Sequence, residues 1–284
     1  MTAYVINLDK RPERWEAMQR RWSPFFEIVR IPGVYLPGNG AAGCKLSHQM
    51  VANHFLETEH LIPVLEDDAV PTTHFKEIGM DCIADARKYI DEWRIVNLGP
   101  YLDVTIIPGL GRANLKPTKS KYFLGASYSQ QTHFMLYNRK SIPILQEALR
   151  SSLPLDIYIG RMLNEVWVPI RLLATQDDSP SDIPKPNVNA SELYTISERM
   201  LEDAIFSRAW WPRCAKCNKL VDRLESVPLP TNPTSQQRAV RYYIVECHGE
   251  IQKKFVGIWA ADEIARKGTR LPDAFCESVN ESKT

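Results

Sequence analysis

The chain has 284 residues, of which 44% are hydrophobic and 24% charged, and its formal net charge is +1. This length can bury a sizeable core in one large domain, or in a large domain and a small one. The balanced charge excludes a strong overall attraction to nucleic acid or to a membrane surface. No stretch approaches the roughly 18 apolar residues of a membrane span. The first residues indicate a strand rather than a signal peptide, so we expect a cytoplasmic protein, or one of the host cytoplasm if the chain is viral.

Apolar runs alternate with segments of helical periodicity over the first two thirds of the chain. We expect strands at residues 3–8, 26–33, 61–67, 94–99 and 166–174, and another strand within residues 125–138. We expect helices at residues 13–22, 40–60, 81–90, 139–152 and 154–165. Strands that alternate with helices predict an α/β domain with a mostly parallel central sheet.

The composition changes twice in the last third of the chain. Residues 177–192 are rich in Pro, Ser, Asp and Asn, which is typical of a loop. Beyond about residue 205, pairs of cysteines and short β-forming runs replace the alternating pattern. We therefore expect one domain at residues 1–205 and a small β-rich module at residues 206–284.

Three consecutive carboxylates, Glu66, Asp67 and Asp68, directly follow the apolar run at 61–65. Like charges at the end of a buried strand repel one another and resist desolvation, so a cation is expected to compensate them. That cation is either a divalent metal ion or nearby Lys and Arg side chains. Ligands of α/β sheets bind at the carboxyl ends of strands, where carboxylates can hold an ion that neutralises a diphosphate. The alternative is a solvated acidic turn.

Several segments resemble, in the same order, those of glycosyltransferase family 25, which includes lipooligosaccharide and procollagen galactosyltransferases. They lie within roughly residues 3–185 and read YVINLDKRPERW, GAAGCKLSHQMV, PVLEDDAV, THFMLYNRKSIPIL, PLDIYI and ATQDDSPSDI. The resemblance implies a GT-A type fold, a nucleotide-diphosphate sugar as donor, with a UDP-sugar expected, and inversion at the anomeric carbon. It also implies Mn²⁺ or Mg²⁺ at the acidic cluster, with Asp68 as the metal ligand and Glu66 and Asp67 in the donor site.

The resemblance further implies a set of residues that border the donor or close over it: Asn7, Asp9, Arg11, Arg14, Ser47, His48, Gln176 and Ser181. Arg11 and Arg14 are equally well explained as surface charges at the start of a helix. A lone histidine is more often structural than catalytic, so a structural role stays open for His48. Cys44 is expected to be a small buried packing residue.

Asp156 is the residue that we expect to act as the catalytic base. Inverting transfer needs a group that takes the proton from the acceptor hydroxyl, and the resemblance places Asp156 at the Pro-x-Asp element of the family. Its alternative role is that of a helix N-cap, which Asp favours. Ile157 departs from the family, which often has Trp there, so acceptor recognition is expected to differ.

The C-terminal module carries a candidate zinc site. Cys214 and Cys217 form a Cys-x-x-Cys pair, and Cys247 and His248 follow roughly 30 residues later, a set that suits tetrahedral Zn²⁺. Adjacent residues of a strand point to opposite faces, so Cys276 is an alternative ligand. Unpaired structural thiols are the other interpretation. The module resembles small zinc-ribbon modules of phage-type proteins.

We expect a metal-dependent hexosyltransferase that acts on a hydroxyl acceptor. Basic residues interleaved with aromatic ones in the module suit a polymer acceptor, such as a glycan or hydroxymethylated DNA, although they also suit a core with a solvated surface. Two alternatives stay open. One is a nucleotidyltransferase or other nucleotide-binding enzyme with the same acidic metal site. The other is an inactive protein that binds carbohydrate or nucleic acid.

Overall fold

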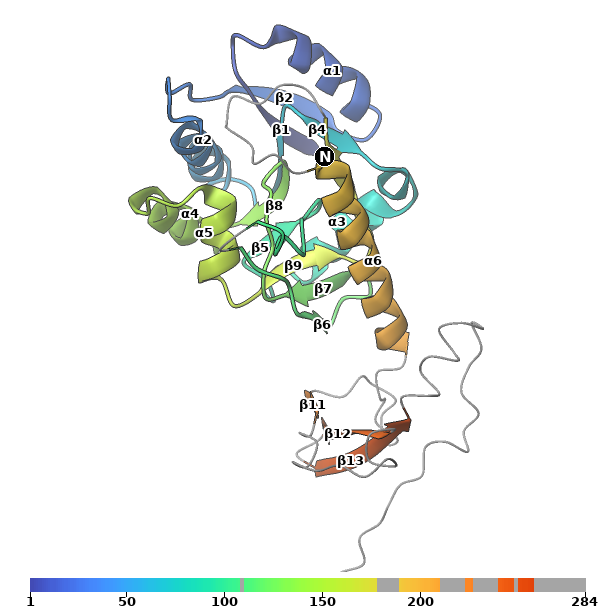
Figure 1. Ribbon diagram of the computed structural model, residues 1–284. Helices are drawn as coiled ribbons and strands as arrows, with labels where there is room; N and C mark the ends of the chain where they lie inside the picture. Colours follow the sequence, from blue (N-terminus) through green and yellow to red (C-terminus); the bar gives the residue numbers. More distant parts are fainter. Residues whose placement is uncertain (108–109, 178–188, 210–222, 227–239, 248–249, 258–284) are drawn as a thin grey trace, which may run out of the picture. The chain divides into compact units, whose positions relative to one another are not determined.

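The computed structural model describes residues 1–107, 110–177, 189–209, 223–226, 240–247 and 250–257 (Figure 1). The chain divides into two compact units, Met1–Ile205 and Phe206–Thr284, and each is described by itself. Among the described residues, no helix combines the length and the apolar character that crossing a membrane requires.

The first unit is an α/β structure built on one eight-stranded sheet in the order β2-β1-β3-β8-β5-β9-β7-β6. Its strands are β1 (Thr2–Asn7), β2 (Glu27–Pro32), β3 (Leu61–Glu66), β5 (Ile95–Asn97), β6 (Leu115–Pro117), β7 (Phe123–Ala126), β8 (Phe134–Asn138) and β9 (Val166–Pro169). Its helices are α1 (Pro12–Trp22), α2 (Gly40–Phe55), the short π-helix η1 (Phe75–Gly79), α3 (Met80–Lys88), α4 (Ser141–Arg150), α5 (Leu155–Met162) and α6 (Ala190–Ala209). The predicted α/β class is confirmed.

The expectation of a mostly parallel sheet is wrong, because the sheet is mixed. Three of its strand pairs are parallel and four are antiparallel. The strand expected within residues 125–138 is β8, and the first residues of that segment are the end of β7. Strand β8 lies antiparallel between β3 and β5, and β7 is antiparallel to both β6 and β9. Every antiparallel pair of this sheet therefore involves β7 or β8.

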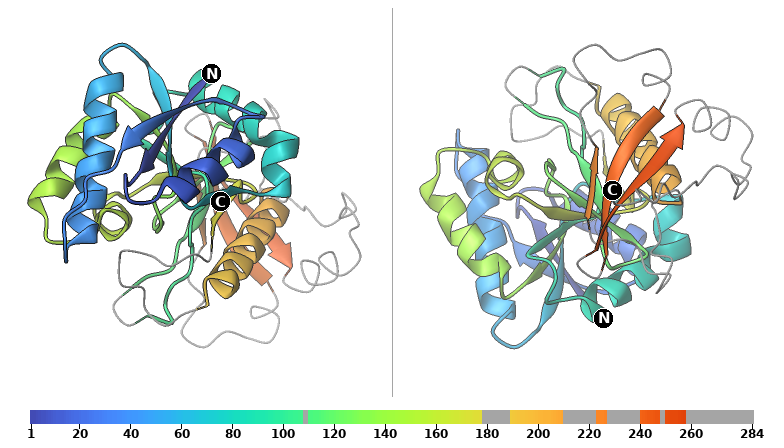
Figure 2. Two further views of the ribbon diagram at one scale, coloured as in Figure 1. Left: turned by 90° about the horizontal axis from the view of Figure 1, so that it is seen from above. Right: turned by 90° about the horizontal axis from the view of Figure 1, so that it is seen from below.

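Helices cover both faces of the sheet. Along β1, Ala3 and Val5 face a cluster with residues of α1, η1 and α3, whereas Tyr4 and Ile6 face a cluster with residues of α2, α4 and α5. The view from above in Figure 2 shows these two sets of helices on opposite sides of the sheet. Strands buried on both faces are expected to be continuously apolar, as β1 and β3 are.

Helix α6 is an element that the sequence analysis did not predict. It begins at Ala190, inside the segment expected to be a loop. Three of its buried residues, Leu193, Ser197 and Leu201, recur every four positions, and the two leucines pack against residues of β7 and β9. Ser197 is a polar residue within this apolar stripe. Its buried hydroxyl accepts a hydrogen bond from the Leu102 amide at 3.0 Å.

The parallel part of the sheet positions the candidate site. Strands β2 and β3 flank β1, with Asn7 paired with Pro32 and Ile6 paired with Glu66. The carboxyl ends of these three strands therefore meet at one edge. Beside them, β4 (Ala69–Pro71) and β10 (Ala174–Gln176) form a small antiparallel sheet that pairs Gln176 with Ala69.

The second unit contains an antiparallel sheet of β11 (Arg223–Ser226), β12 (Val240–Cys247) and β13 (Glu250–Gly257). Cys247 is the last residue of β12 and pairs with Glu250. The remaining candidate zinc ligands lie outside the described residues: Cys214, Cys217, His248 and Cys276. The predicted zinc site therefore stays a prediction.

Candidate functional site

A pocket of about 160 Å³ lies at the carboxyl ends of β1 and β3. Its walls come from the ends of these strands, from the segment after β2 and from helix α2. It contains all three consecutive carboxylates, together with several residues expected in a donor site. Its lining includes Arg14, Tyr35, Cys44, His48, Glu66 and Asp68.

Asp67 is compensated by an arginine. Arg14 Nη1 lies 2.7 Å from Asp67 Oδ1, and the side chains are only 13% and 10% exposed. Asn7 Nδ2 donates to the other oxygen, Asp67 Oδ2, at 2.8 Å. Asn7 itself is fully buried, and its Oδ1 accepts from Arg30 Nε at 2.7 Å. The cation that compensates Asp67 is therefore the guanidinium of Arg14.

Asp9 and Arg11 occupy more peripheral positions. The Asp9 side chain is 78% exposed and pairs with Arg30, with Nη2 to Oδ1 at 2.6 Å. The backbone carbonyl of Arg11 accepts from Asn7 Nδ2 at 2.9 Å, and its guanidinium lies 3.9 Å from Glu13. The structure thus brings Asn7 and Arg14 to the acidic cluster and leaves the Asp9 carboxylate at the surface.

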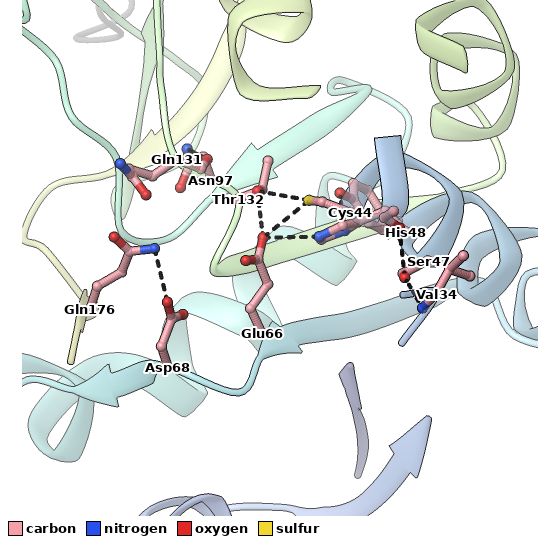
Figure 3. A network of polar contacts seen from close by, with 12 residues as sticks. Val34, Cys44, Ser47, His48, Glu66, Asp68, Asn97, Gln131, Thr132 and Gln176 are labelled. Atoms are coloured by element: carbon pink, nitrogen blue, oxygen red, sulfur yellow. Dashed lines mark hydrogen bonds and ion pairs between the residues drawn. The ribbon is translucent and has the colours of Figure 1, made fainter. Parts of the chain in front are cut away.

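Asp68 lies beside Gln176, which the resemblance implies is a residue of the donor site. Gln176 Nε2 donates to Asp68 Oδ2 at 3.4 Å, and the Asp177 amide donates to the Asp68 backbone carbonyl at 2.8 Å (Figure 3). Strand pairing between β4 and β10 holds the two segments together. Ser181, the other residue expected here, lies outside the described residues.

Glu66 is the centre of a separate polar cluster (Figure 3). Its Oε1 accepts from the Thr132 hydroxyl and lies 3.1 Å from His48 Nε2 and 3.8 Å from Cys44 Sγ. The second ring nitrogen, His48 Nδ1, lies 2.9 Å from the Tyr137 hydroxyl. Burial would raise the pKa of Glu66, but the hydrogen bonds and charge of His48 and the Thr132 hydroxyl outweigh it and lower that pKa to about 2.

One group among the residues that the structure describes could hold a metal ion. Cys44 Sγ, a ring nitrogen of His48 and a Glu66 oxygen lie within 4.8 Å of one another, so this cluster could hold an ion. Among the described residues, the three consecutive carboxylates do not form such a group, because Asp67 faces Arg14 and Glu66 faces His48. Asp68 is the member of the trio that contacts Gln176.

Ser47 ties helix α2 to the wall of the pocket. Its hydroxyl accepts from the Val34 amide at 2.8 Å and donates to the Gly43 carbonyl at 2.8 Å. A Cβ atom on Gly43 would overlap the Val34 carbonyl oxygen, so glycine permits this close approach. These contacts give Ser47 a structural function in the pocket.

Asp156 lies in the first turn of α5, but it is not the N-cap. The N-cap is Pro154, and Asp156 Oδ1 accepts from the Ile157 amide at 2.8 Å. Burial raises the pKa of Asp156, the Ile157 and Gln131 amides lower it in part, and the charge of Glu66 raises it further. A half-buried carboxyl group with a raised pKa is a stronger base than an ordinary aspartate.

Sequence reasoning missed the partners that organise these groups. Asn97, only 1% exposed, donates to Ser129 Oγ and to the carbonyls of Gln130 and Gln131 at 2.8–2.9 Å. Thr132 and Tyr137 were assigned no role, although both lie in the segment THFMLYN. Cys44 and His48 are four residues apart on α2, a spacing that places both on one helix face and could have identified the cluster.

Comparison with known proteins leaves the family open. No protein-family model matches the sequence, and a search of the curated proteins finds no match.

Proposed function

We propose that the chain is a glycosyltransferase that moves a hexose from a nucleotide-diphosphate sugar to a hydroxyl acceptor. The proposal rests on the observation that residues from distant segments of the chain meet in one pocket. Segments that resemble the glycosyltransferase family are far apart in the chain, yet Arg14, His48 and Asp68 line one pocket. Gln176, from the last of those segments, donates to Asp68.

The position of the pocket supports a diphosphate ligand. Ligands of α/β sheets bind beyond the carboxyl ends of strands, and this pocket lies beyond β1, β2 and β3. Arg14 supplies a guanidinium at its wall, fixed by Asp67. An arginine held in place by a carboxylate can donate to phosphate oxygens without a further loss of side-chain freedom.

The Asp68 carboxylate fits the divalent ion that the resemblance implies. Mg²⁺ and similar hard ions are usually held by one or two carboxylates together with substrate phosphates, and Asp68 offers buried oxygen ligands in the pocket. When bound, such an ion supplies positive charge that stabilises a departing diphosphate. Gln176 orients the Asp68 carboxylate through its amide.

Asp156 is the base in this proposal. The Gln131 and Ile157 amides orient its carboxylate, and burial with the nearby Glu66 charge raises its pKa. A base of raised pKa takes the proton of an acceptor hydroxyl more readily while the bond to the diphosphate breaks. The acceptor itself, a glycan or hydroxymethylated DNA, is proposed from the basic and aromatic residues of the second unit.

The test is to supply the protein with Mn²⁺ and a panel of nucleotide sugars and to measure the release of nucleoside diphosphate. We expect release from one donor, and a loss of about 100-fold or more in Asp68→Asn and Asp156→Asn. Asp203→Asn makes the same chemical change on the exposed side of α6 and is expected to keep full activity.

Two results would contradict the proposal. One is the absence of nucleoside diphosphate release with every donor. The other is equal activity in Asp68→Asn and Asp203→Asn. Release of pyrophosphate from a nucleoside triphosphate would instead identify a nucleotidyltransferase.

A further inference from the structure

We propose that Cys44, His48 and Glu66 form a second metal site, selective for a thiophilic divalent ion of the zinc type and distinct from the Asp68 position. The three side chains line the same pocket as Asp68 but present sulfur, nitrogen and oxygen ligands. Mn²⁺ and Mg²⁺ prefer all-oxygen sites, whereas Zn²⁺ accepts this mixed set. The inference does not depend on the proposed glycosyltransferase activity.

The spacing of the ligand atoms fits a tetrahedral ion. Zn–S bonds of about 2.3 Å and Zn–N or Zn–O bonds of about 2.0 Å place sulfur and oxygen ligands about 3.5 Å apart, and nitrogen and oxygen about 3.3 Å apart. The observed separations are 3.8 Å from Cys44 Sγ to Glu66 Oε1 and 3.1 Å from His48 Nε2 to the same oxygen. Both observed separations are close to these values, and all three ligand atoms lie within 4.8 Å of one another.

The backbone supplies two rigid platforms for these ligands. Cys44 and His48 project from successive turns of α2, and Glu66 is the last residue of β3 in the centre of the sheet. His48 is fully buried, so it has little freedom to turn away. The Thr132 hydroxyl lies 3.9 Å from Cys44 Sγ and donates to Glu66, so it contacts two of the three ligands.

Charge also favours an ion here. A thiolate and a carboxylate together neutralise a divalent cation, and the imidazole adds no charge. The thiolate is the form of cysteine that binds a metal ion, so an ion would take the place of the Cys44 thiol proton. Binding an ion would release that one proton to solvent and would separate the sulfur from the Glu66 charge by a cation.

Tyr137 provides the outer partner that a metal-bound histidine usually has. His48 Nε2 lies 3.1 Å from Glu66 Oε1, and Nδ1 lies 2.9 Å from the Tyr137 hydroxyl. With an ion on Nε2, the ring proton would sit on Nδ1 and would be donated to the Tyr137 oxygen. Tyr137 would then fix the orientation of the histidine ring.

The test is metal binding by the full chain after treatment with a chelator, without any nucleotide sugar. Zn²⁺ bound per chain is counted, and Co²⁺ is used as a spectroscopic probe because thiolate ligands give a charge-transfer absorption band. Any ion held at the zinc site predicted for the second unit is common to all variants, so the readout is the difference between variants. Cys82→Ala is the matched control, since Cys82 is a free, buried cysteine of the core.

We expect Cys44→Ala to bind about one equivalent less than the wild type and to lose the corresponding part of the cobalt band. Cys82→Ala is expected to match the wild type. Tyr137→Phe keeps all ligands and is expected to weaken Zn²⁺ binding about tenfold. Glu66→Gln serves as the ligand variant if Cys44→Ala does not fold.

Equal zinc stoichiometry and equal cobalt spectra in the wild type and the folded ligand variants would overturn the inference. A Cys82→Ala protein that loses the same signal would overturn it too. Neither result involves donor turnover, so failure of this inference and failure of the proposed transferase activity are separate outcomes.

Discussion

His48 and Glu66 are 18 residues apart in the chain, and their side chains meet with Nε2 and Oε1 separated by 3.1 Å. The contact joins the buried face of α2 to the end of β3, next to the pocket. It stabilises the ionised form of Glu66, because the folded protein lowers the pKa of that carboxyl group. The electrostatics of the site are therefore coupled to the stability of the first unit.

The lowered pKa of Glu66 predicts acid sensitivity. A carboxyl group with an ordinary pKa of 4.5 in the unfolded chain and about 2 in the folded protein stabilises the fold above about pH 4.5. This stabilisation is lost as the pH falls from about 4.5 towards about 2. Urea denaturation of the metal-free protein across this pH range is expected to show a falling free energy of unfolding. In Glu66→Gln the free energy of unfolding is expected to depend less on pH. An unchanged pH dependence in Glu66→Gln would refute the assignment.

The pair formed by Arg14 and Asp67 is expected to be important for stability. Arg14→Ala leaves the Asp67 carboxylate buried without its guanidinium partner, which we expect to cost about 3 kcal/mol in the free energy of unfolding. Arg20 offers a matched control on the same helix, because its pair with Glu16 is exposed. Arg20→Ala is expected to cost less than about 0.5 kcal/mol. Similar losses in the two variants would contradict this account of Asp67.

Replacing Gly43 even with alanine is expected to destabilise the protein. A Cβ atom there would overlap the Val34 carbonyl oxygen, so Gly43→Ala must push the segment after β2 away from α2. We expect a loss of about 1–3 kcal/mol in the free energy of unfolding. The same displacement would disturb the hydrogen bond between the Val34 amide and Ser47, and with it the pocket wall. Wild-type stability in Gly43→Ala would show that the wall is less tightly packed.

Gln131 has a left-handed backbone, with φ of 75°. Asn97 holds this turn by donating to its carbonyl at 2.8 Å, and the Gln131 amide faces Asp156. Glycine adopts this conformation without steric cost, whereas a β-branched residue does not. Gln131→Gly is therefore expected to be at least as stable as the wild type, and Gln131→Val to lose about 1–2 kcal/mol. Equal thermal stability of the two variants would be incompatible with the assigned backbone.

Local patterns predicted most elements of the first unit. The expected helix at 13–22 corresponds to α1, and the expected strand at 61–67 to β3, because their apolar spacing is set by the face that each buries. Strand direction was not predictable in this way. It depends on which strands become neighbours, and β8 inserts between two strands that precede it in the chain.

The site was predictable in part. The acidic cluster at a strand end follows from the apolar run before it, but the cation that faces Asp67 comes from Arg14, 53 residues earlier. No local pattern records that pairing. Cys44 was predicted to be a packing residue because its thiol was considered alone, whereas the structure places it beside Glu66 and Thr132.

The central claim is that the pocket beside Asp68 binds the diphosphate of a nucleotide sugar together with a divalent ion. The most direct measurement is diffraction from crystals grown with MnCl₂ and UDP, with data collected at the manganese absorption edge. The account predicts an anomalous peak at the Asp68 carboxylate and the diphosphate between Asp68 and Arg14. Manganese and nucleotide bound elsewhere, with this pocket unchanged, would contradict it.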